Sequence, residues 1–90
     1  MHWFVYMILC SDDSLYTGIT NDVPRRFRQH ADKQGAKYFR GRSPKRLVYV
    51  ESGHDHSSAA QREVVIKKMG RDLKMQLVES EINEAERFSC

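Results

Sequence analysis

The stretch that decides the fold runs from residue 3 to residue 20 and reads WFVYMILC-SDDS-LYTGIT. Its first part, Trp3–Cys10, is apolar at every position, which is typical of a strand buried on both faces and central in its sheet. Ser11–Ser14 has the composition of a turn, and Leu15–Thr20 resumes as a second strand. We therefore predict an antiparallel hairpin, in which Gly18 marks a place where another group comes close.

A helix is expected directly after the hairpin. Asn21 or Asp22 can cap it, and Pro24 fits its first turn. Arg26 and His30 lie one turn apart beside the apolar stripe of this helix and therefore project together. The stripe itself recurs every four residues, at Val23, Phe27 and Ala31.

The rest of the chain predicts one more strand and further helices. Residues 36–40 fit a short helix, and Arg46–Glu51 (RLVYVE) reads as a third strand. Ser58–Gln61 has the spacing of a capping box, which predicts a helix from Ser58 to Met69 that Gly70 would end. A last helix over Asp72–Glu79 would bury Leu73, Leu77 and Val78. The fold class is then α+β: a small three-stranded antiparallel sheet, of open strand order, flanked by helices. Residues 1–79 form a single domain, and residues 80–90 form an acidic tail, helical or frayed.

Composition and charge narrow the class of protein. No apolar run approaches the ~20 residues that span a bilayer, and no secretion signal is evident, so we expect a cytoplasmic protein without membrane contact. The only cysteines, Cys10 and Cys90, favour a reducing compartment. The net charge is only +3, but nine Lys or Arg and a single acid, Asp32, lie between Arg25 and Arg46. This concentration indicates a face that binds a polyanion, and the alternative is a solvated helix face beside a basic loop.

Glu63 needs a separate explanation. On the predicted helix it lies between Ala59, Ala60 and Ile66, where a carboxylate is costly unless another group compensates it. The alternative is a surface pair with Lys67 at helical spacing, which is worth only ~0.3–0.5 kcal/mol.

The tripeptides Val5-Tyr6-Met7 and Tyr16-Thr17-Gly18, with the residues that follow them, resemble the GIY-YIG nuclease superfamily, in particular its small stand-alone bacterial members. The resemblance covers residues 3–70. The residues that match its signature positions are, in chain order, Tyr6, Tyr16, Gly18, Arg26, His30 and Glu63. The chain departs from the pattern at Val5, at Met7, at Ile19, where some relatives have lysine, and at 73–75, where many members have an asparagine.

The resemblance implies a phosphodiesterase mechanism that uses one divalent metal, Mg²⁺ or Mn²⁺, with Glu63 as its ligand. Arg26 would neutralise charge on the phosphate. Tyr6, Tyr16 and His30 are the candidate bases. Ionising a tyrosine at pH 7 requires ~4 kcal/mol of stabilisation, whereas the reference pKa of histidine, ~6.5, makes His30 the easier proton acceptor. We expect a base or relay role for His30. Taken singly, each of these residues also fits a structural role in the core or on a helix surface.

The implied substrate is DNA, duplex or branched, and RNA is a further possibility. The residues expected to contact it are Arg25, Arg28, Lys37, Tyr38, Arg40, Arg42 and Lys45. Tyr38 and Phe39 could stack on unpaired bases or simply pack a short helix. Two other functions stay open: a nucleic-acid-binding module of the same fold with weak or no catalysis, which the departures motivate, and a protein-interaction domain.

Overall fold

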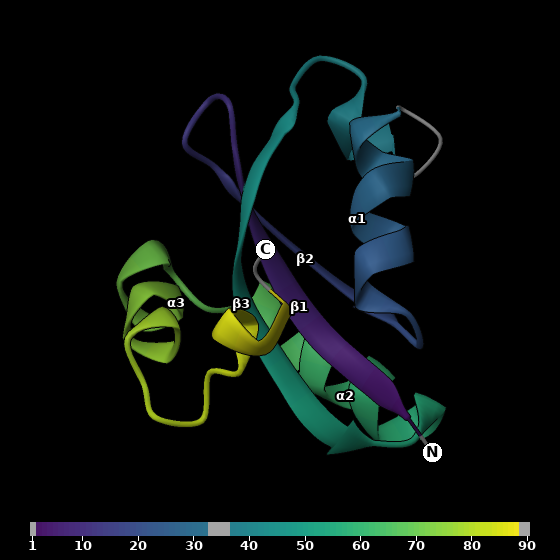
Figure 1. Ribbon diagram of the computed structural model, residues 1–90. Helices are drawn as coiled ribbons and strands as arrows, with labels where there is room; N and C mark the ends of the chain where they lie inside the picture. The colour runs from purple at the N-terminus through teal and green to yellow at the C-terminus, as the bar shows by residue number, and fades with distance from the viewer. Residues whose placement is uncertain (1, 33–36, 89–90) are drawn as a thin grey trace.

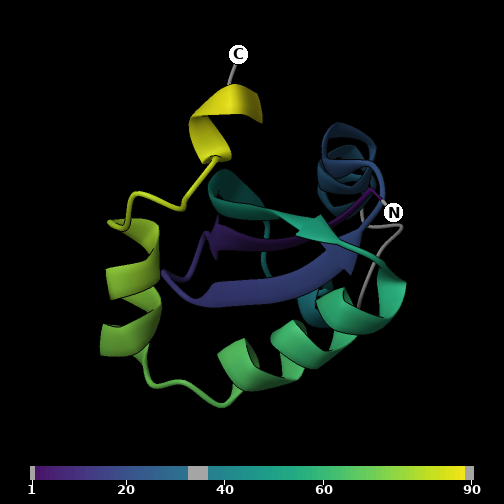
Figure 2. The same cartoon turned by 90° about the horizontal axis from the view of Figure 1, so that it is seen from below.

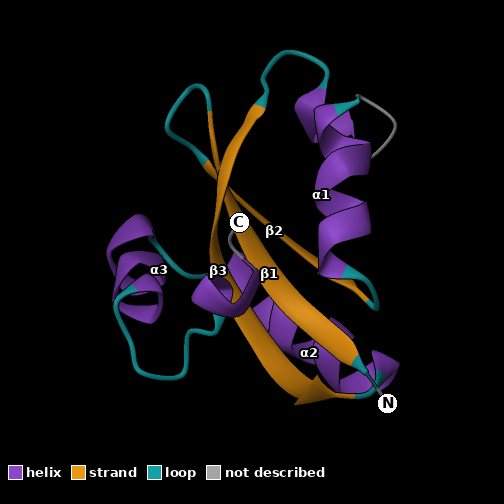
Figure 3. Ribbon diagram, viewed as in Figure 1, coloured by secondary structure: helices purple, strands orange, loops and turns teal. Residues whose placement is uncertain are grey.

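The computed structural model describes residues 2–32 and 37–88, and their architecture is α+β, as predicted (Figures 1 and 3). In chain order the elements are β1 (Trp3–Cys10), β2 (Leu15–Thr20), α1 (Val23–Ala31), the 3-10 helix η1 (Lys37–Phe39), β3 (Pro44–His54), α2 (His56–Lys67), α3 (Arg71–Val78) and the 3-10 helix η2 (Ala85–Phe88).

The three strands form one antiparallel sheet in the order β2-β1-β3. The predicted hairpin is confirmed, and β1 is the central strand, which explains why all its positions are apolar. β3 is longer than the predicted Arg46–Glu51 because it pairs with the whole of β1, from Trp3 opposite His54 to Cys10 opposite Pro44.

Each face of the sheet has its own apolar cluster. On one face, Tyr6 and Val50 pack with Phe39 and with Val23 and Phe27 of α1. Ala31, the third residue of the predicted stripe, is exposed because it lies in the last turn of α1. On the other face, Met7 and Tyr49 pack against α2 and the last turn of α3. Figure 2 shows α1 and η2 on one side of the sheet and α2 on the opposite side. α1 and α2 therefore approach the sheet from opposite faces.

α1 is capped by Asp22, whose side chain accepts a hydrogen bond from the backbone N–H of Arg25 at 3.1 Å. The predicted start of α2 at Ser58 is wrong by two residues. Asp55 is the cap, its carboxylate accepts from the Ser58 N–H at 2.8 Å, and Ser58 occupies the third helical position of the capping box. The helix ends at Lys67 rather than Met69, and Gly70 begins α3 instead of ending α2.

The predicted burial of α3 is right at its end and wrong at its start. Leu77 and Val78 pack against the second apolar cluster, whereas Leu73 is 51% exposed. The reason is that α3 meets the sheet through its last turn, so the apolar position in its first turn has no core to enter. η1 covers Lys37–Phe39 of the short helix expected at residues 36–40, and residue 36 lies outside the described residues.

The segment after α3 returns to the edge of β3 (Figure 1). Asn83 donates to the carbonyls of Val48 and Val78, both at 2.8 Å, and its Oδ1 accepts from the Val50 N–H at 3.1 Å. Ala85 is buried in the first cluster, and Phe88 packs beside it. Among residues 2–32 and 37–88, no helix is long and apolar enough to cross a membrane.

Candidate active site

The centre of the candidate site is a buried hydrogen bond between Tyr6 and His30. Tyr6 lies in the middle of β1 and His30 in the last turn of α1, and their side chains are 2% and 0% exposed. The Tyr6 hydroxyl is 2.8 Å from His30 Nε2. The Nδ1 atom of His30 has no hydrogen-bond partner among the described residues, so the tautomer of the ring is not fixed by a second contact.

Gly18 of β2 makes room for this pair. It lies directly opposite Tyr6 in the sheet. A Cβ at Gly18 would be 2.6 Å from the Tyr6 hydroxyl oxygen, 2.7 Å from its Cζ and 3.1 Å from Cε2 of Tyr16. The absence of a side chain therefore lets the Tyr6 ring lie across β2 towards Tyr16, whose ring centre is 6.2 Å from that of Tyr6 and 5.2 Å from that of His30.

Arg26 lies one turn before His30 on α1, and its Nη1 donates to Oε1 of Gln29 at 3.0 Å. It is close enough to both tyrosines and to His30 to influence their protonation. Burial, together with the charge of Arg26, lowers the pKa of His30 to about 4. The imidazole is therefore neutral at pH 7.

The two tyrosines are also neutral at rest. Burial raises the pKa of Tyr6 well above its usual value of 10, and the charge of Arg26 only partly offsets this. Burial also raises the pKa of Tyr16, against the lowering effect of the charges of Lys67 and Arg26. The candidate site thus holds two phenols and a neutral imidazole beside cationic side chains.

Glu63 joins the site from α2, across the edge strand β2. Besides burial, its charge contributes to the raised pKa of Tyr6 and Tyr16, and the Lys67 ammonium that it binds lies 6.0 Å from the centre of the Tyr16 ring. Its Oε2 atom is also 3.2 Å from the ammonium of Lys67. The two alternatives for Glu63 are therefore not exclusive, because the helical pair with Lys67 forms at the same place where the carboxylate approaches the tyrosines.

Known proteins resemble this chain in sequence and in fold. The family model of the GIY-YIG catalytic domain matches residues 2–76. The chain belongs to the GIY-YIG family. A UPF0213 protein of Haloquadratum walsbyi is 49% identical over 90% of this chain and 93% of its own length, and one of Clostridium perfringens is 44% identical over 94% and 91%.

A solved structure is also similar. The solution NMR structure of a UPF0213 protein from Bacillus halodurans is 40% identical, covers 99% of this chain and 95% of its own, and superposes with a TM-score of 0.59. Membership of the GIY-YIG family implies a nuclease-type function and a nucleic acid as substrate. GIY-YIG nucleases generally use divalent metal ions.

The donor set fits one hard ion of this kind. In residues 2–32 and 37–88, no three His, Cys, Asp or Glu side chains converge in a cage for a metal. Glu63 is a single carboxylate with 21% of its side chain exposed. Mg²⁺ keeps several waters and is commonly held by one or two carboxylates together with substrate phosphates, so one acid at the surface suffices.

Some of the residues predicted to contact nucleic acid lie near the candidate site. The Tyr38 ring lies 5.0 Å from that of Tyr16, and the Arg42 guanidinium covers it at 4.0 Å from its centre. Arg42 also pairs with Asp12 at 3.2 Å. Arg25 lines a polar hollow of about 230 Å³ beside Arg26. Lys37, the first residue of η1, and Arg40, which follows η1, are exposed, whereas Phe39 is buried in the core and offers no stacking surface.

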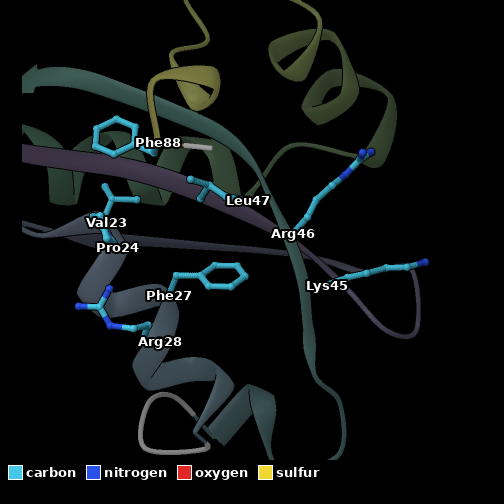
Figure 4. A pocket seen from close by; sticks show the side chains of 8 residues that line it. All are labelled: Val23, Pro24, Phe27, Arg28, Lys45, Arg46, Leu47 and Phe88. Atoms are coloured by element: carbon cyan, nitrogen blue, oxygen red, sulfur yellow. The ribbon is translucent and has the colours of Figure 1, made fainter. Parts of the chain in front are cut away.

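Two predicted contacts lie elsewhere. Arg28 and Lys45 border a different, apolar groove of about 470 Å³ between α1 and β3, in which Phe27, Leu47 and Phe88 face one another (Figure 4). The long side chains of Arg28 and Lys45 extend away from this groove (Figure 4). Arg28 and Lys45 therefore line a different hollow from the one beside Arg25 and Arg26, and their contact with nucleic acid stays a prediction.

Other residues near the site carry no separate sequence signal. Gln29 accepts a hydrogen bond from Arg26, and their spacing of three residues on one helix is the sequence feature that could have indicated this contact. Glu51 of β3 binds Arg62 of α2 through both carboxylate oxygens, at 3.1 and 3.2 Å, and also accepts from Tyr49 and His54. This cluster ties α2 to the sheet directly beside Glu63.

Proposed function

We propose that this protein is a divalent-metal-dependent endonuclease that hydrolyses phosphodiester bonds in DNA. The observation that supports this most strongly is the convergence of two phenols, an imidazole, a guanidinium and one carboxylate at the edge strand β2. In the proposal Tyr6, Tyr16, Arg26, His30 and Glu63 form the catalytic set. Family membership supports the reaction class, and the single accessible acid supports a one-metal site.

Arg26 and Glu63 have electrostatic roles. Arg26, held by Gln29, stabilises negative charge that develops on the phosphate, and removing a preorganised partner of this kind typically costs ~3–4 kcal/mol. Glu63 would hold Mg²⁺ or Mn²⁺ together with waters and phosphate oxygens. When bound, the ion supplies further positive charge to the phosphate and to the attacking water.

Tyr6 and His30 move a proton as a pair. A group with a pKa of about 4 is a poor final base at pH 7, but its neutral imidazole accepts a hydrogen bond from a phenol 2.8 Å away. We therefore assign His30 a relay role: the Tyr6 hydroxyl takes a proton from water while its own proton passes to Nε2. Tyr16, beside them, orients the water or the phosphate.

The deciding experiment is nicking of supercoiled plasmid and of branched DNA with Mg²⁺. We expect activity in the wild type and a loss of about 10²–10³-fold in Arg26→Ala and Glu63→Gln. Glu81→Gln, which neutralises an exposed acid beyond α3, is the matched control and should stay active. No nicking by the wild type, or equal nicking by both site variants, would refute the proposal.

DNA binding measured against salt separates the alternative function. A surface that contacts several phosphates loses affinity steeply as salt rises. Salt-dependent binding without cleavage would identify a nucleic-acid-binding module of the same fold. A flat salt response would argue against nucleic acid as the partner.

A further inference from the structure

Lys67 is a cation of the site that the mechanism above does not use. It lies at the end of α2, one helical turn after Glu63, and its ammonium is 3.2 Å from the Glu63 Oε2 atom. The same ammonium is 6.0 Å from the centre of the Tyr16 ring. Lys67 therefore lies between the proposed metal ligand and one of the two phenols.

The position creates a conflict with the metal. A divalent ion and an ammonium repel each other when both lie against the Glu63 carboxylate, because both are positive, so they compete for it. The Glu63–Lys67 pair is weak, since an i,i+4 pair at the surface is worth ~0.3–0.5 kcal/mol, so the ion can displace the ammonium. The Lys67 side chain is 52% exposed and has a flexible four-carbon stem, which allows it to move.

We propose that Lys67 is the counter-ion of Glu63 in the metal-free protein and becomes a phosphate ligand beside Tyr16 when metal binds. The inference rests on the proposed function. Before metal arrives, the ammonium compensates a carboxylate that would otherwise lie half-buried next to two phenols. After metal arrives, the displaced ammonium has the substrate phosphate as its nearest remaining anion. One side chain thereby couples metal loading to substrate binding.

The proposal predicts opposite effects of one substitution on metal binding and on activity. Lys67→Met keeps the length of the side chain but removes the competing charge. Mn²⁺, titrated into metal-free protein without DNA and followed by the EPR signal of the free ion, should bind about 2- to 10-fold more tightly. Plasmid nicking at saturating Mn²⁺ should fall at least about tenfold, because the phosphate loses a cation.

Three variants complete the test. Lys67→Arg should stay close to the wild type in both measurements. Lys68→Met removes the neighbouring exposed lysine and should change neither by more than about twofold, which controls for net charge. Glu63→Gln should abolish the Mn²⁺ binding that the other variants share.

The outcomes separate this inference from the proposed function. If Lys67→Met binds Mn²⁺ no more tightly than the wild type, Lys67 does not compete with the ion for Glu63. The same conclusion follows if Glu63→Gln binds Mn²⁺ as well as the wild type does. If Lys67→Met nicks plasmid as fast as the wild type, Lys67 is not a phosphate ligand, and the nuclease proposal is unaffected. Tighter binding in Lys67→Met combined with an inactive wild type refutes the nuclease function and the phosphate role, but supports the competition at Glu63.

Discussion

Replacing Gly18 by alanine tests the geometry of the site at its narrowest point. The new Cβ would be 2.6 Å from the Tyr6 hydroxyl oxygen, where ordinary contact begins at 3.4 Å, so the ring must retreat by about 0.8 Å. Tyr6 is fixed on its other side by His30 at 2.8 Å. Overpacking of this kind costs ~1–3 kcal/mol, and the backbone entropy that alanine saves offsets only ~0.5–1 kcal/mol. We expect a net destabilisation of about 1–2 kcal/mol.

Urea denaturation followed by circular dichroism measures this loss, which corresponds to a fall of roughly 5–15 °C in Tm for a domain of this size. Gly41→Ala is the matched control, because a Cβ there meets nothing within 4 Å. It should be neutral or slightly stabilising. The NMR signals of the His30 ring should shift in Gly18→Ala and not in the control. Equal stability of the two variants, with an unchanged His30 signal, would show that Tyr6 does not occupy the space over Gly18.

Three further perturbations have defined outcomes. His30 is neutral in the folded protein down to its pKa of about 4 but is protonated below about 6.5 when unfolded, so the unfolded chain binds more protons in this window. The free energy of unfolding should therefore fall by about 3 kcal/mol from pH 6.5 to pH 4. In His30→Gln, urea denaturation at the same pH values should not show this fall. Arg62→Met removes the bidentate partner of Glu51 and should cost about 1–3 kcal/mol by thermal denaturation, whereas Lys68→Met should cost little. Asn83→Ala leaves the Val50 N–H without its acceptor and should cost about 1–3 kcal/mol, and stability equal to the wild type would show that the segment after α3 does not hold β3.

The parts of the fold that follow local rules could be predicted from the sequence. The apolar run Trp3–Cys10 indicated a central strand, which is correct. The predicted stripe of α1 is correct for Val23 and Phe27, which pack in the core, and wrong for Ala31, which is exposed at the end of the helix. Arg26 and His30 could be placed side by side because helical spacing fixes their relation without knowledge of the rest of the chain. The hydrogen bond between Tyr6 and His30 could not be derived in this way, since it depends on how α1 crosses the sheet.

The parts that depend on distant contacts could not be predicted. α2 has little apolar stripe to orient it, because Ala59 and Ile66 are buried while Val64 and Val65 are about half exposed. Its attachment relies on the bidentate contact of Arg62 with a strand residue eleven positions earlier. The role of Asn83 likewise depends on carbonyl and N–H groups of β3 more than thirty residues away. Neither contact leaves a periodic signal in the sequence.

The location of the site follows from the two-sided architecture. α1 supplies Arg26 and His30 from one face of the sheet, and α2 supplies Glu63 from the other. Side chains from opposite faces can meet only where the sheet ends, and β2 is the edge strand next to Tyr6. At that edge even a single Cβ would crowd the Tyr6 ring, which is why Gly18 is required there. At this edge the Glu63 side chain is 21% exposed and Arg26 is partly exposed, so the proposed nucleic-acid substrate would reach these two groups, while Tyr6 and His30 stay buried.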